Sequence, residues 1–480
     1  MKKTKKNNQE LLEIISISVL LLSIIISIVF MVNLNNLLPI KYMLLIGISV
    51  IIFYIFFTLF NFKWKKHNKV LISFNIISIL IVLVELFAIF KIGDTVKFLN
   101  DNLGNKNNTV IYNLITKKDS IYNSENDLKD ISVLYYKDLD DDSKLIEKVN
   151  NLKLEKYDDN VYDMLKLVIS DNRVVLVSSA YYETMLDIDE EYDDETKIIA
   201  TYEIEVEKEV ETSNVDVTTT PFLLFINGID TRSGKLPARS LSDVNILMAL
   251  NPKKKEILMT AIPRDYYVQL HGTTGYKDKL THSGTYGGIN STMSTIEDLF
   301  GLNIDHYIRL NFNSVINLVD AIGGITIVSD VDYPFVCHTN KSCTINPGSN
   351  NLDGKCALAF ARERKAYSTG DKHRGENQEQ VISAILTKIT SSKTLINNYS
   401  DILSAMDGTF ESSLKTDDIT ALIKMQIDDM SRWSVNTYNV NGTPGMDYTY
   451  SYPHQKLSIM YPDYSTVTLA KNKIKSILNK

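Results

Sequence analysis

The segment Ser242 to Val268, SDVNILMALNPKKKEILMTAIPRDYYV, decides the fold of the largest part of this chain. Val244 to Leu250 and Glu256 to Ile262 are apolar runs of strand length, and the turn signal Asn251-Pro252 lies between them. Upstream, Phe222 to Ile226 has the composition of a further buried strand. These three strands are predicted to belong to one sheet.

Downstream of this segment, helix and strand patterns alternate. Ser291 to Phe300 is predicted as a helix, Tyr307 to Asn311 as a strand, Phe312 to Ala321 as a helix, and Ile325 to Val328 as a strand. Alternation of this kind favours a central sheet flanked by helices. Residues 221–480 are therefore predicted to form one large α/β domain.

The preceding part, residues 92–204, is predicted to be a small accessory α/β domain. Ile131 to Tyr136 and Arg173 to Ser179 have strand patterns, whereas Ser143 to Leu152 and Asn160 to Ile169 have the spacing of amphipathic helices. No catalytic motif is recognisable in this part of the sequence.

Polar and acidic segments surround the accessory domain. Residues 205–220, EVEKEVETSNVDVTTT, carry no helical apolar period and are predicted to be a linker. Acidic clusters at Asp138 to Asp142 and Asp187 to Glu195 invite a calcium interpretation, but the second lacks the glycine that an EF-hand turn needs at its sixth position. Solvated loops are the expected explanation for both clusters.

Three long apolar runs open the chain, at residues 11–32, 42–60 and 70–90. Each is close to the roughly 20 residues that a helix needs to cross the hydrocarbon core. A cleaved signal peptide is the alternative for the first run, but that run is too long for an apolar h-region and two more runs follow. Residues 1–91 are therefore predicted to be a membrane anchor. Glu85 is expected to be a carboxyl facing a neighbouring helix, with a functional role as the alternative.

The positions of the lysines predict the orientation of this anchor. The loop between the first and second runs holds only Lys41, whereas lysines precede the first run and fill the loop between the second and third, at Lys2, Lys3, Lys5, Lys6, Lys63, Lys65, Lys66 and Lys69. The amino terminus is therefore predicted to be cytoplasmic. Three crossings then place everything after about Lys91 on the outer face of the cell membrane.

Charge and cysteine content exclude some classes of function. The formal net charge is −7, which argues against a nucleic-acid-binding protein. Cys337 and Cys343 bracket the short polar loop CHTNKSC and are predicted to form a disulfide, while Cys356 in an apolar stretch is expected to be a buried thiol. No cysteine pair or histidine pair has the spacing of a zinc site.

The segment ARERKAYSTGDKHRGENQEQ gathers four polar side chains around Asp371, namely Arg362, Arg364, Arg374 and Gln378. Clustered arginines repel one another unless an anion lies between them, and a guanidinium group matches two phosphate oxygens at once. Arg362 and Arg364 are two apart and would point the same way on an extended segment, whereas Arg374 and Gln378 are four apart and would share one helix face. The segment therefore predicts a phosphate site at the start of a helix.

Several segments together resemble the LytR-CpsA-Psr family of bacterial cell-envelope phosphotransferases. Their order and spacing over about 230 residues make this resemblance specific. The segments are GID (Gly228 to Asp230), SDVNILMALNPKKKEILMTAIPRDYYV (Ser242 to Val268), KDKLTHSGTYGG (Lys277 to Gly288), VDAIGGI (Val319 to Ile325), LDGKCALAFARER (Leu352 to Arg364), GDKHRGENQ (Gly370 to Gln378) and GMDYTYSY (Gly445 to Tyr452).

The resemblance implies an enzyme that takes a phosphoglycosyl polymer, of the teichoic acid or capsular polysaccharide type, from a polyprenyl pyrophosphate carrier. The acceptor it implies is a sugar hydroxyl of peptidoglycan. Splitting a pyrophosphate requires its oxygens to be neutralised, and cationic side chains together with a divalent ion do this. The expected pyrophosphate ligands are Arg239, Arg264, Lys279, Arg362, Arg364, Arg374 and Gln378.

Asp230 and Asp243 are the expected ligands of Mg²⁺, with Mn²⁺ as the alternative, because a hard cation bound to phosphate takes one or two protein carboxylates. Arg264, Arg374 and Asp371 are the expected catalytic residues. Asp371 either orients an arginine or accepts the proton of the incoming hydroxyl as a general base.

Arg239 departs from the family pattern, in which Arg-Ser-Asp is contiguous. Here Arg239 stands two residues further from Asp243. Either a bulge restores its position or its contact is lost.

The polyprenyl chain would require an apolar tunnel, although apolar residues at these periods are more often ordinary core. The tunnel candidates are Ile246, Met248, Leu258, Phe300, Leu310, Phe312 and Leu318. Two other functions remain open at this point: a pyrophosphatase that uses water as acceptor, and a non-enzymatic envelope regulator that binds lipid phosphate.

Overall fold

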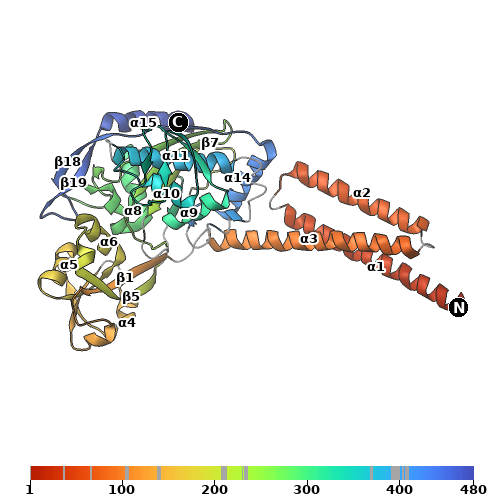
Figure 1. Ribbon diagram of the computed structural model, residues 1–480, viewed down its shortest axis with the longest axis horizontal. Helices are drawn as coiled ribbons and strands as arrows, with labels where there is room; N and C mark the ends of the chain where they lie inside the picture. Colours follow the sequence, from red (N-terminus) through yellow and green to blue (C-terminus); the bar gives the residue numbers. More distant parts are fainter. Residues whose placement is uncertain are drawn as a thin grey trace. The chain divides into compact units, whose positions relative to one another are not determined.

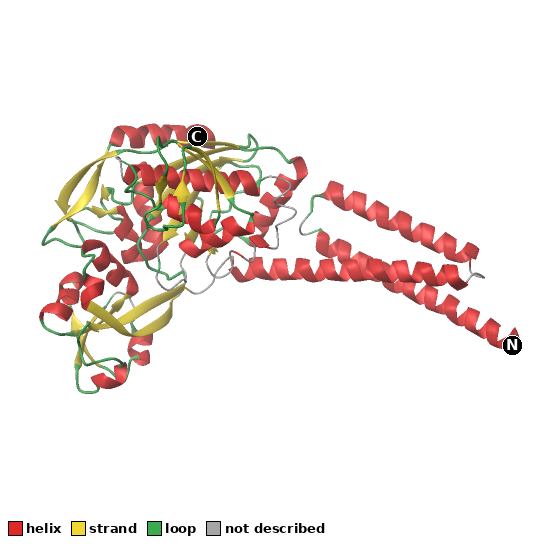
Figure 2. Cartoon of the chain, viewed as in Figure 1, coloured by secondary structure: helices red, strands yellow, loops and turns green. Residues whose placement is uncertain are grey.

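The computed structural model describes residues 2–35, 38–64, 68–102, 108–137, 142–206, 213–229, 231, 236–367, 371–390, 401–402, 405 and 410–479. These residues form two compact units. The first comprises Met1–Asp101 and Thr416–Ser431, and the second comprises Asn102–Lys415 and Arg432–Lys480. All the named strands belong to the second unit (Figure 2).

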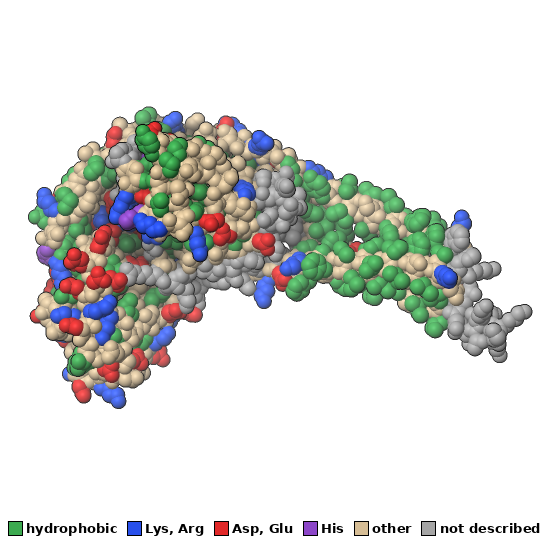
Figure 3. Space-filling view, viewed as in Figure 1, with side chains coloured by type: hydrophobic (Ala, Val, Ile, Leu, Met, Phe, Trp, Pro, Cys, Tyr) green, Lys and Arg blue, Asp and Glu red, His purple; other side chains and the backbone are tan. Residues whose placement is uncertain are grey.

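The first unit contains the helices α1 (Lys2–Leu34), α2 (Ile40–Trp64) and α3 (Asn68–Asn102). Each holds a segment long and apolar enough to cross a membrane, at Glu10–Leu34, Ile40–Phe60 and Asn68–Asp94. Apolar side chains cover the visible face of these helices, with few charged groups between their ends (Figure 3). The predicted membrane anchor of three helices is therefore supported by the structure.

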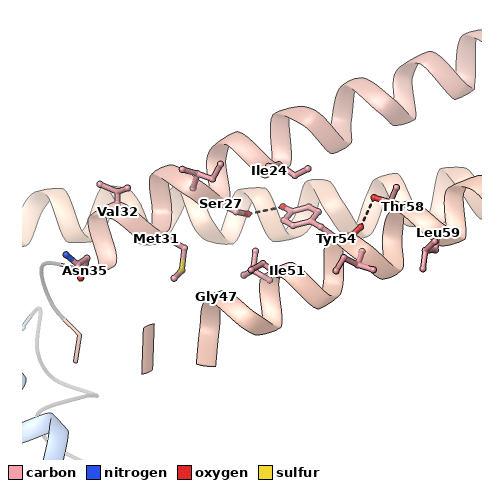
Figure 4. Close-up of a pocket in the computed structure, with 13 residues that line it drawn as sticks. Ile24, Ser27, Met31, Val32, Asn35, Gly47, Ile51, Tyr54, Thr58 and Leu59 are labelled. Atoms are coloured by element: carbon pink, nitrogen blue, oxygen red, sulfur yellow. Dashed lines mark hydrogen bonds between the residues drawn. The ribbon is translucent and has the colours of Figure 1, made fainter. Parts of the chain in front are cut away.

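Polar side chains meet inside this helical unit. Glu85 of α3 is only 5% exposed, and the hydroxyl of Ser27 in α1 lies 2.7 and 2.9 Å from its two carboxylate oxygens. The same hydroxyl lies 2.9 Å from that of Tyr54 in α2. Glu85 thus faces a neighbouring helix, as the sequence predicts. Beside Ser27 and Tyr54, α1 and α2 enclose a largely apolar groove of about 900 Å³ (Figure 4).

Helix α14 (Thr416–Asp429) belongs to this first unit, although it lies far from α1–α3 in the sequence. Lys41 forms an ion pair of 3.0 Å with Asp428, and Lys424 donates a hydrogen bond of 2.7 Å to the carbonyl of Asn35. The structure thus groups α14 with the first unit, apart from the rest of residues 221–480. Its polar contacts are with Lys41 of α2 and with Asn35 after α1, and no local sequence pattern indicates them.

The larger sheet of the second unit has the strand order β16-β11-β6-β7-β8-β17. Its central strands are β6 (Phe222–Ile229), β7 (Val244–Asn251) and β8 (Glu256–Ile262), which pair in antiparallel register. Strand β11 (His306–Asn311) joins β6 in parallel, and β17 (Ser434–Thr437) joins β8 in parallel. The predicted strands around Ser242 to Val268 are thus confirmed.

The remaining pairings complete this architecture. Strand β16 (Phe410–Ser412) lies antiparallel to β11 at one edge of the larger sheet. Strand β12 (Ile325–Ser329) pairs with β15 (Gly348–Leu352) in a separate ribbon, and β18 (Gly442–Tyr448) pairs with β19 (Lys456–Pro462) in another.

Helices cover both faces of the larger sheet (Figure 1). Leu258 and Ile262 of β8 belong to the apolar core that includes α8 (Ser283–Phe300) and α15 (Tyr464–Leu478). Successive strand residues point to opposite faces. Ala261 accordingly faces α11 (Asp371–Ile389), where a methyl group added at Gly375 would lie 3.9 Å from the Ala261 methyl carbon.

Two further helices adjoin α11. Helix α9 (Phe312–Ala321) packs against α10 (Gly354–Ala361), and α10 packs against α11. Arg362 caps α10 with helical backbone angles of φ −99° and ψ −4°. The extended geometry expected for Arg362 is therefore wrong, because the apolar CALAFA segment forms a helix that ends at this residue.

The smaller sheet of the second unit has the order β3-β2-β4-β1-β5. Its strands are β1 (Asn108–Lys117), β2 (Ser132–Tyr136), β3 (Lys153–Tyr157), β4 (Val174–Ser178) and β5 (Thr196–Val206). Helix α4 (Ser143–Lys148) lies between β2 and β3 in the chain, and α5 (Val161–Ser170), α6 (Ser179–Ile188) and α7 (Tyr192–Glu195) lie between β3 and β5. The predicted strands and helices of this region are present.

The smaller and larger sheets share buried contacts. Tyr452 and Leu457 belong to the same apolar cluster as residues of α5 and α6, and the amide of Ala238 donates a hydrogen bond of 2.7 Å to the carbonyl of Thr109. The smaller sheet therefore packs within the same compact unit as the larger one. Of the predicted linker, residues 207–212 lie outside the described residues, and 205–206 continue β5.

Cys337 and Cys343 are free thiols in the structure, in contrast to the predicted disulfide. The two residues face each other beyond the short strands β13 (Phe335–Val336) and β14 (Thr344–Ile345), and the amide of Cys337 donates a hydrogen bond of 2.9 Å to the carbonyl of Cys343. Burial raises the pKa of each thiol to about 11.

A substitution at Gly284 tests how tightly α8 packs against the loop before β7. A methyl group at this position would lie 2.3 Å from the carbonyl oxygen of Ser240, so backbone must shift to accommodate it. We expect Gly284→Ala to destabilise the protein by about 1–3 kcal/mol, measured by chemical unfolding. Gly375→Ala is the matched control, because its methyl group meets only ordinary contact, and no loss of stability is expected there. Equal stability of the two variants would contradict this packing.

Candidate phosphate site

The ends of two paired strands position the centre of the candidate site. Asp243 directly precedes β7, and Arg264 follows the end of β8 by two residues. Because Asn245 pairs with Ile262 in the antiparallel register, the start of β7 and the end of β8 lie at one edge of the sheet. Asp243 and Arg264 therefore meet, and a guanidinium NH1 group of Arg264 donates to Oδ1 of Asp243.

Lys279 reaches the same place through a short strand pair. Strand β10 (Asp278–Lys279) pairs with β9 (Tyr267–Val268), and the amide of Thr281 donates a hydrogen bond of 2.8 Å to the carbonyl of Arg264. The Lys279 ammonium group lies 3.8 Å from Asp265, and Nε of Arg264 lies 3.5 Å from the same carboxylate. Arg264 and Lys279 therefore also share the carboxylate of Asp265.

A carboxylate that the sequence did not identify joins these cations. Asp187 lies near the end of α6, and its two carboxylate oxygens contact Arg264 and Lys279. Burial opposes ionisation of Asp187, but the charges of Arg264 and Lys279 hold its pKa well below its usual value. The prediction that the Asp187 to Glu195 cluster is a solvated loop is therefore wrong at Asp187, since only 17% of that side chain is exposed.

His282 is buried next to this cluster. Its Nδ1 atom lies 2.7 Å from Oδ1 of Asp278 and 3.0 Å from the hydroxyl of Ser451, and its Nε2 atom lies 3.7 Å from Asp187. Burial lowers the pKa of His282, whereas Asp278 and Asp187 raise it, with a net increase over its usual value. When protonated, His282 places a further positive charge beside the Asp187 carboxylate.

Two helices carry the other predicted phosphate ligands to the same end of β8. The Asn377 side chain on α11 donates a hydrogen bond of 3.1 Å to the carbonyl of Phe360 at the end of α10, and Glu379 accepts one of 3.1 Å from the amide of Ala261 in β8. Arg374 and Gln378 lie one turn apart on α11. These contacts place the start of α11 beside the end of β8.

The side chains of the arginine segment differ in exposure. Arg362 and Arg374 are half-buried and Arg364 is exposed. The Arg362 guanidinium group lies 4.4 Å from the centre of the Phe312 ring. Asp243 thus contacts Arg264 directly, and Lys279 shares two carboxylates with Arg264, those of Asp187 and Asp265. Arg374 and Gln378 lie on α11, which contacts β8 at Ala261, and Arg362 ends α10.

Two of the predicted site residues fall partly outside what the structure describes. Asp230 lies outside the described residues, and for Asp371 the structure describes the backbone, which begins α11. Their roles as metal ligand and as base or orienting group stay predictions.

Arg239 lies in the loop before β7 and is half-buried. Ser240 in this loop accepts a hydrogen bond of 2.9 Å from Arg309, a fully buried residue of β11 that the sequence did not single out. The strand itself begins at Val244. The loop, not a bulge in β7, therefore sets the position of Arg239.

The tunnel candidates include ordinary core residues. Leu258 and Phe300 belong to the apolar cluster between the larger sheet and the helices α8 and α15. Ile246 and Met248 are buried within the sheet, whereas Leu310, Phe312 and Leu318 are half-buried. For Leu258 and Phe300 the core interpretation is correct.

These observations define an α/β protein with three N-terminal helices long and apolar enough to cross a membrane, whose larger sheet presents clustered cations and carboxylates at its strand ends. Residues 177–463 match the LytR_cpsA_psr family, and the chain belongs to that family. The family match begins inside the smaller sheet, at β4, and therefore includes Asp187.

Individual relatives are similar at moderate identity. The chain is 31% identical over 232 residues to biofilm regulatory protein A of Streptococcus mutans, covering 46% of this chain and 57% of that protein. It is 33% identical over 241 residues to the polyisoprenyl-teichoic acid–peptidoglycan teichoic acid transferase TagT of Bacillus subtilis, covering 49% of this chain and 73% of that protein. A solved structure of protein gbs0355 from Streptococcus agalactiae aligns with a TM-score of 0.48 at 28% identity, covering 56% of this chain and 92% of that chain.

Glu379 is expected to make the folding stability of the protein depend on pH. Burial raises the pKa of this carboxyl to about 7 in the folded protein, against 4.5 for an unperturbed glutamate. The unfolded chain therefore loses this proton first, and folding stability falls as pH rises from about 4.5 to about 7. We expect Glu379→Gln to leave stability unchanged near pH 4 and to increase it above pH 8, by on the order of 3 kcal/mol at most.

The check is urea unfolding of both proteins across this pH range. A stability difference that does not grow with pH would contradict the raised pKa of Glu379.

Proposed function

We propose that this protein is a membrane-anchored phosphotransferase. It takes a phosphoglycosyl polymer from a polyprenyl pyrophosphate carrier and passes it to a sugar hydroxyl of peptidoglycan. The observation that carries the proposal is the pair of cations at the edge of the larger sheet, where Arg264 contacts Asp243 and shares the carboxylate of Asp187 with Lys279. The name of the similar Bacillus subtilis transferase supports the choice of polymer and acceptor.

The cluster suits a diphosphate for electrostatic reasons. Negative charge grows on the leaving phosphate as the pyrophosphate bond breaks, and fixed cations stabilise that charge best where water is scarce. The side chains of Arg264 and Lys279 are only 16% and 7% exposed, and carboxylates hold both in place. Arg362, Arg364, Arg374 and Gln378 would add donors from α10 and α11, where the amino terminus of α11 contributes partial positive charge.

The acceptor hydroxyl needs a group that takes its proton. Asp371 at the start of α11 is the proposed base, with orientation of Arg374 as its other role. Substitution by asparagine separates these roles, because an amide still accepts a hydrogen bond from arginine but takes no proton.

Mg²⁺, or Mn²⁺ in its place, is the proposed cofactor. Asp243 is a partly exposed carboxylate, and both of its contacts within the site, with Arg264 and with Thr281 at 3.4 Å, use Oδ1. Among the residues that the structure describes, no group of three or more His, Cys, Asp and Glu side chains could hold a metal ion. The ion would therefore rely on Asp243 and Asp230 together with phosphate oxygens, as is usual for Mg²⁺. When bound, it would neutralise phosphate charge.

The proposed location is the outer face of the cell membrane. The lysine distribution around the three apolar helices supports a cytoplasmic amino terminus. An alkaline phosphatase domain fused after residue 102 is expected to be active in cells, and one fused after residue 66 inactive. The reverse pattern would contradict this orientation.

Arg264→Ala is expected to lower kcat/KM for a lipid-linked donor by about 100-fold or more, because it removes a cation that faces the reacting phosphate. Arg173→Ala is the matched control, since Arg173 forms an ion pair of 2.7 Å with Glu155 at the surface of the smaller sheet. Transfer is measured from lipid-linked polymer to peptidoglycan fragments. Full activity of Arg264→Ala would contradict the site, and equal donor consumption without the acceptor would favour the pyrophosphatase.

Removal of divalent ions with a chelator is expected to abolish transfer, and added Mg²⁺ or Mn²⁺ to restore it. Asp243→Asn is expected to raise the Mg²⁺ concentration for half-maximal activity by at least about tenfold, since even outer-shell substitutions cost a metal site that much. An unchanged Mg²⁺ requirement in Asp243→Asn would remove Asp243 from the metal site.

A further inference from the structure

Asp187 is the one acidic side chain of the smaller sheet's helices whose described contacts reach the phosphate site. One carboxylate oxygen contacts the NH2 group of Arg264 and the other contacts the ammonium group of Lys279. Nε2 of His282 lies 3.7 Å from it as well. Three groups that can carry positive charge therefore surround a single carboxylate.

The helix that carries Asp187 is fixed on the larger part of the unit. The hydroxyl of Thr184 lies 2.9 Å from that of Thr285 in α8, and both residues are fully buried. The rings of Tyr181 and Tyr286 meet edge to face with centres 5.9 Å apart. Moving Asp187 away from the site would break this buried interface, so the carboxylate acts as a fixed part of the site.

The charges of the cluster show what Asp187 does. Arg264 and Lys279 lie close enough to share one carboxylate, and without it their like charges would repel at low dielectric. Lys279 is only 7% exposed, and its remaining carboxylate neighbour, Asp265, lies at 3.8 Å. A buried ammonium group that loses its closest partner tends to move toward water, because an unpaired buried charge is costly. That movement would take Lys279 away from the phosphate.

We propose that Asp187 is a positioning residue for phosphate binding, which holds Arg264 and Lys279 side by side in the site. The smaller sheet thereby supplies part of the binding site, in addition to its structural role. This inference rests on the proposed function, because it assigns Asp187 to the same pyrophosphate site. The opposite possibility, an internal anion that blocks the site, predicts the opposite sign for the same substitution.

The experiment uses the full chain in detergent or nanodiscs with Mg²⁺. Asp187→Asn is compared with Asp189→Asn, an exposed aspartate two residues further along, and with Asp187→Glu. Binding of inorganic pyrophosphate is measured by calorimetry, and kcat and KM for the lipid-linked donor are measured separately. We expect Asp187→Asn to weaken pyrophosphate binding by about 10–30-fold, which corresponds to about 1.4–2 kcal/mol, and to act on KM more than on kcat.

Asp189→Asn is expected to match the wild type, and Asp187→Glu to recover part of the binding. A double-mutant cycle with Lys279→Met separates positioning from a general structural role. If Asp187 acts through Lys279, the effect of Asp187→Asn on pyrophosphate binding shrinks to less than about threefold in the Lys279→Met background.

Tighter binding or faster transfer by Asp187→Asn would show an inhibitory anion and overturn the inference. An effect of equal size in the Lys279→Met background would overturn it too, as would a wild type that does not bind pyrophosphate. Should Asp187→Asn fail to fold, Asp187→Glu decides, because unchanged binding in that variant contradicts fixed positioning. A wild type that binds pyrophosphate but transfers no polymer would refute the proposed function alone, and the binding measurements would still test Asp187.

Discussion

The antiparallel register between β7 and β8 is the constraint on which the rest of the candidate site depends. It places the start of one strand beside the end of the other, so that Asp243 and Arg264 meet at one edge of the larger sheet. Every other element of the site is arranged around this pair. The β9–β10 ribbon adds Lys279, and the contact of α11 with Ala261 brings the arginine segment to the same edge. A charged cluster with little exposure to water follows from this register.

A cluster with this little exposure requires each charge to have a partner, since an unpaired buried charge costs several kcal/mol. The carboxylates of Asp187, Asp243 and Asp265 supply partners for Arg264 and Lys279, and His282 in turn pairs with Asp278. The shared core of the two sheets is what makes this balance possible. It brings α6 against α8, and with it a carboxylate from a part of the chain that the sequence suggests is a separate domain.

The membrane unit obeys a different rule, because lipid offers no hydrogen bonds to polar groups. Ser27, Tyr54 and Glu85 accordingly satisfy one another between three apolar helices. Helix α14 joins this unit through an ion pair between Asp428 and Lys41 of α2 and a hydrogen bond from Lys424 to the carbonyl of Asn35. A segment inside the family match thus packs with the membrane helices, and the membrane unit includes more of the chain than its hydrophobic spans.

The sequence by itself determined the local elements: three apolar helices, the strands β6, β7 and β8, and the helix at Arg374 and Gln378, because periodicity and turn residues act over a few neighbouring positions. It also predicted Asp243, Arg264 and Lys279 as site residues, through motifs whose order resembles that of the family, and the structure brings these three residues to one edge of the larger sheet. Only the tertiary structure revealed the contacts of Asp187, the grouping of α14 with the first unit and the burial of Cys337 and Cys343. These depend on burial and on partners distant in the chain, such as the 77 positions between Asp187 and Arg264, and no local pattern records which distant residue will neutralise a buried charge.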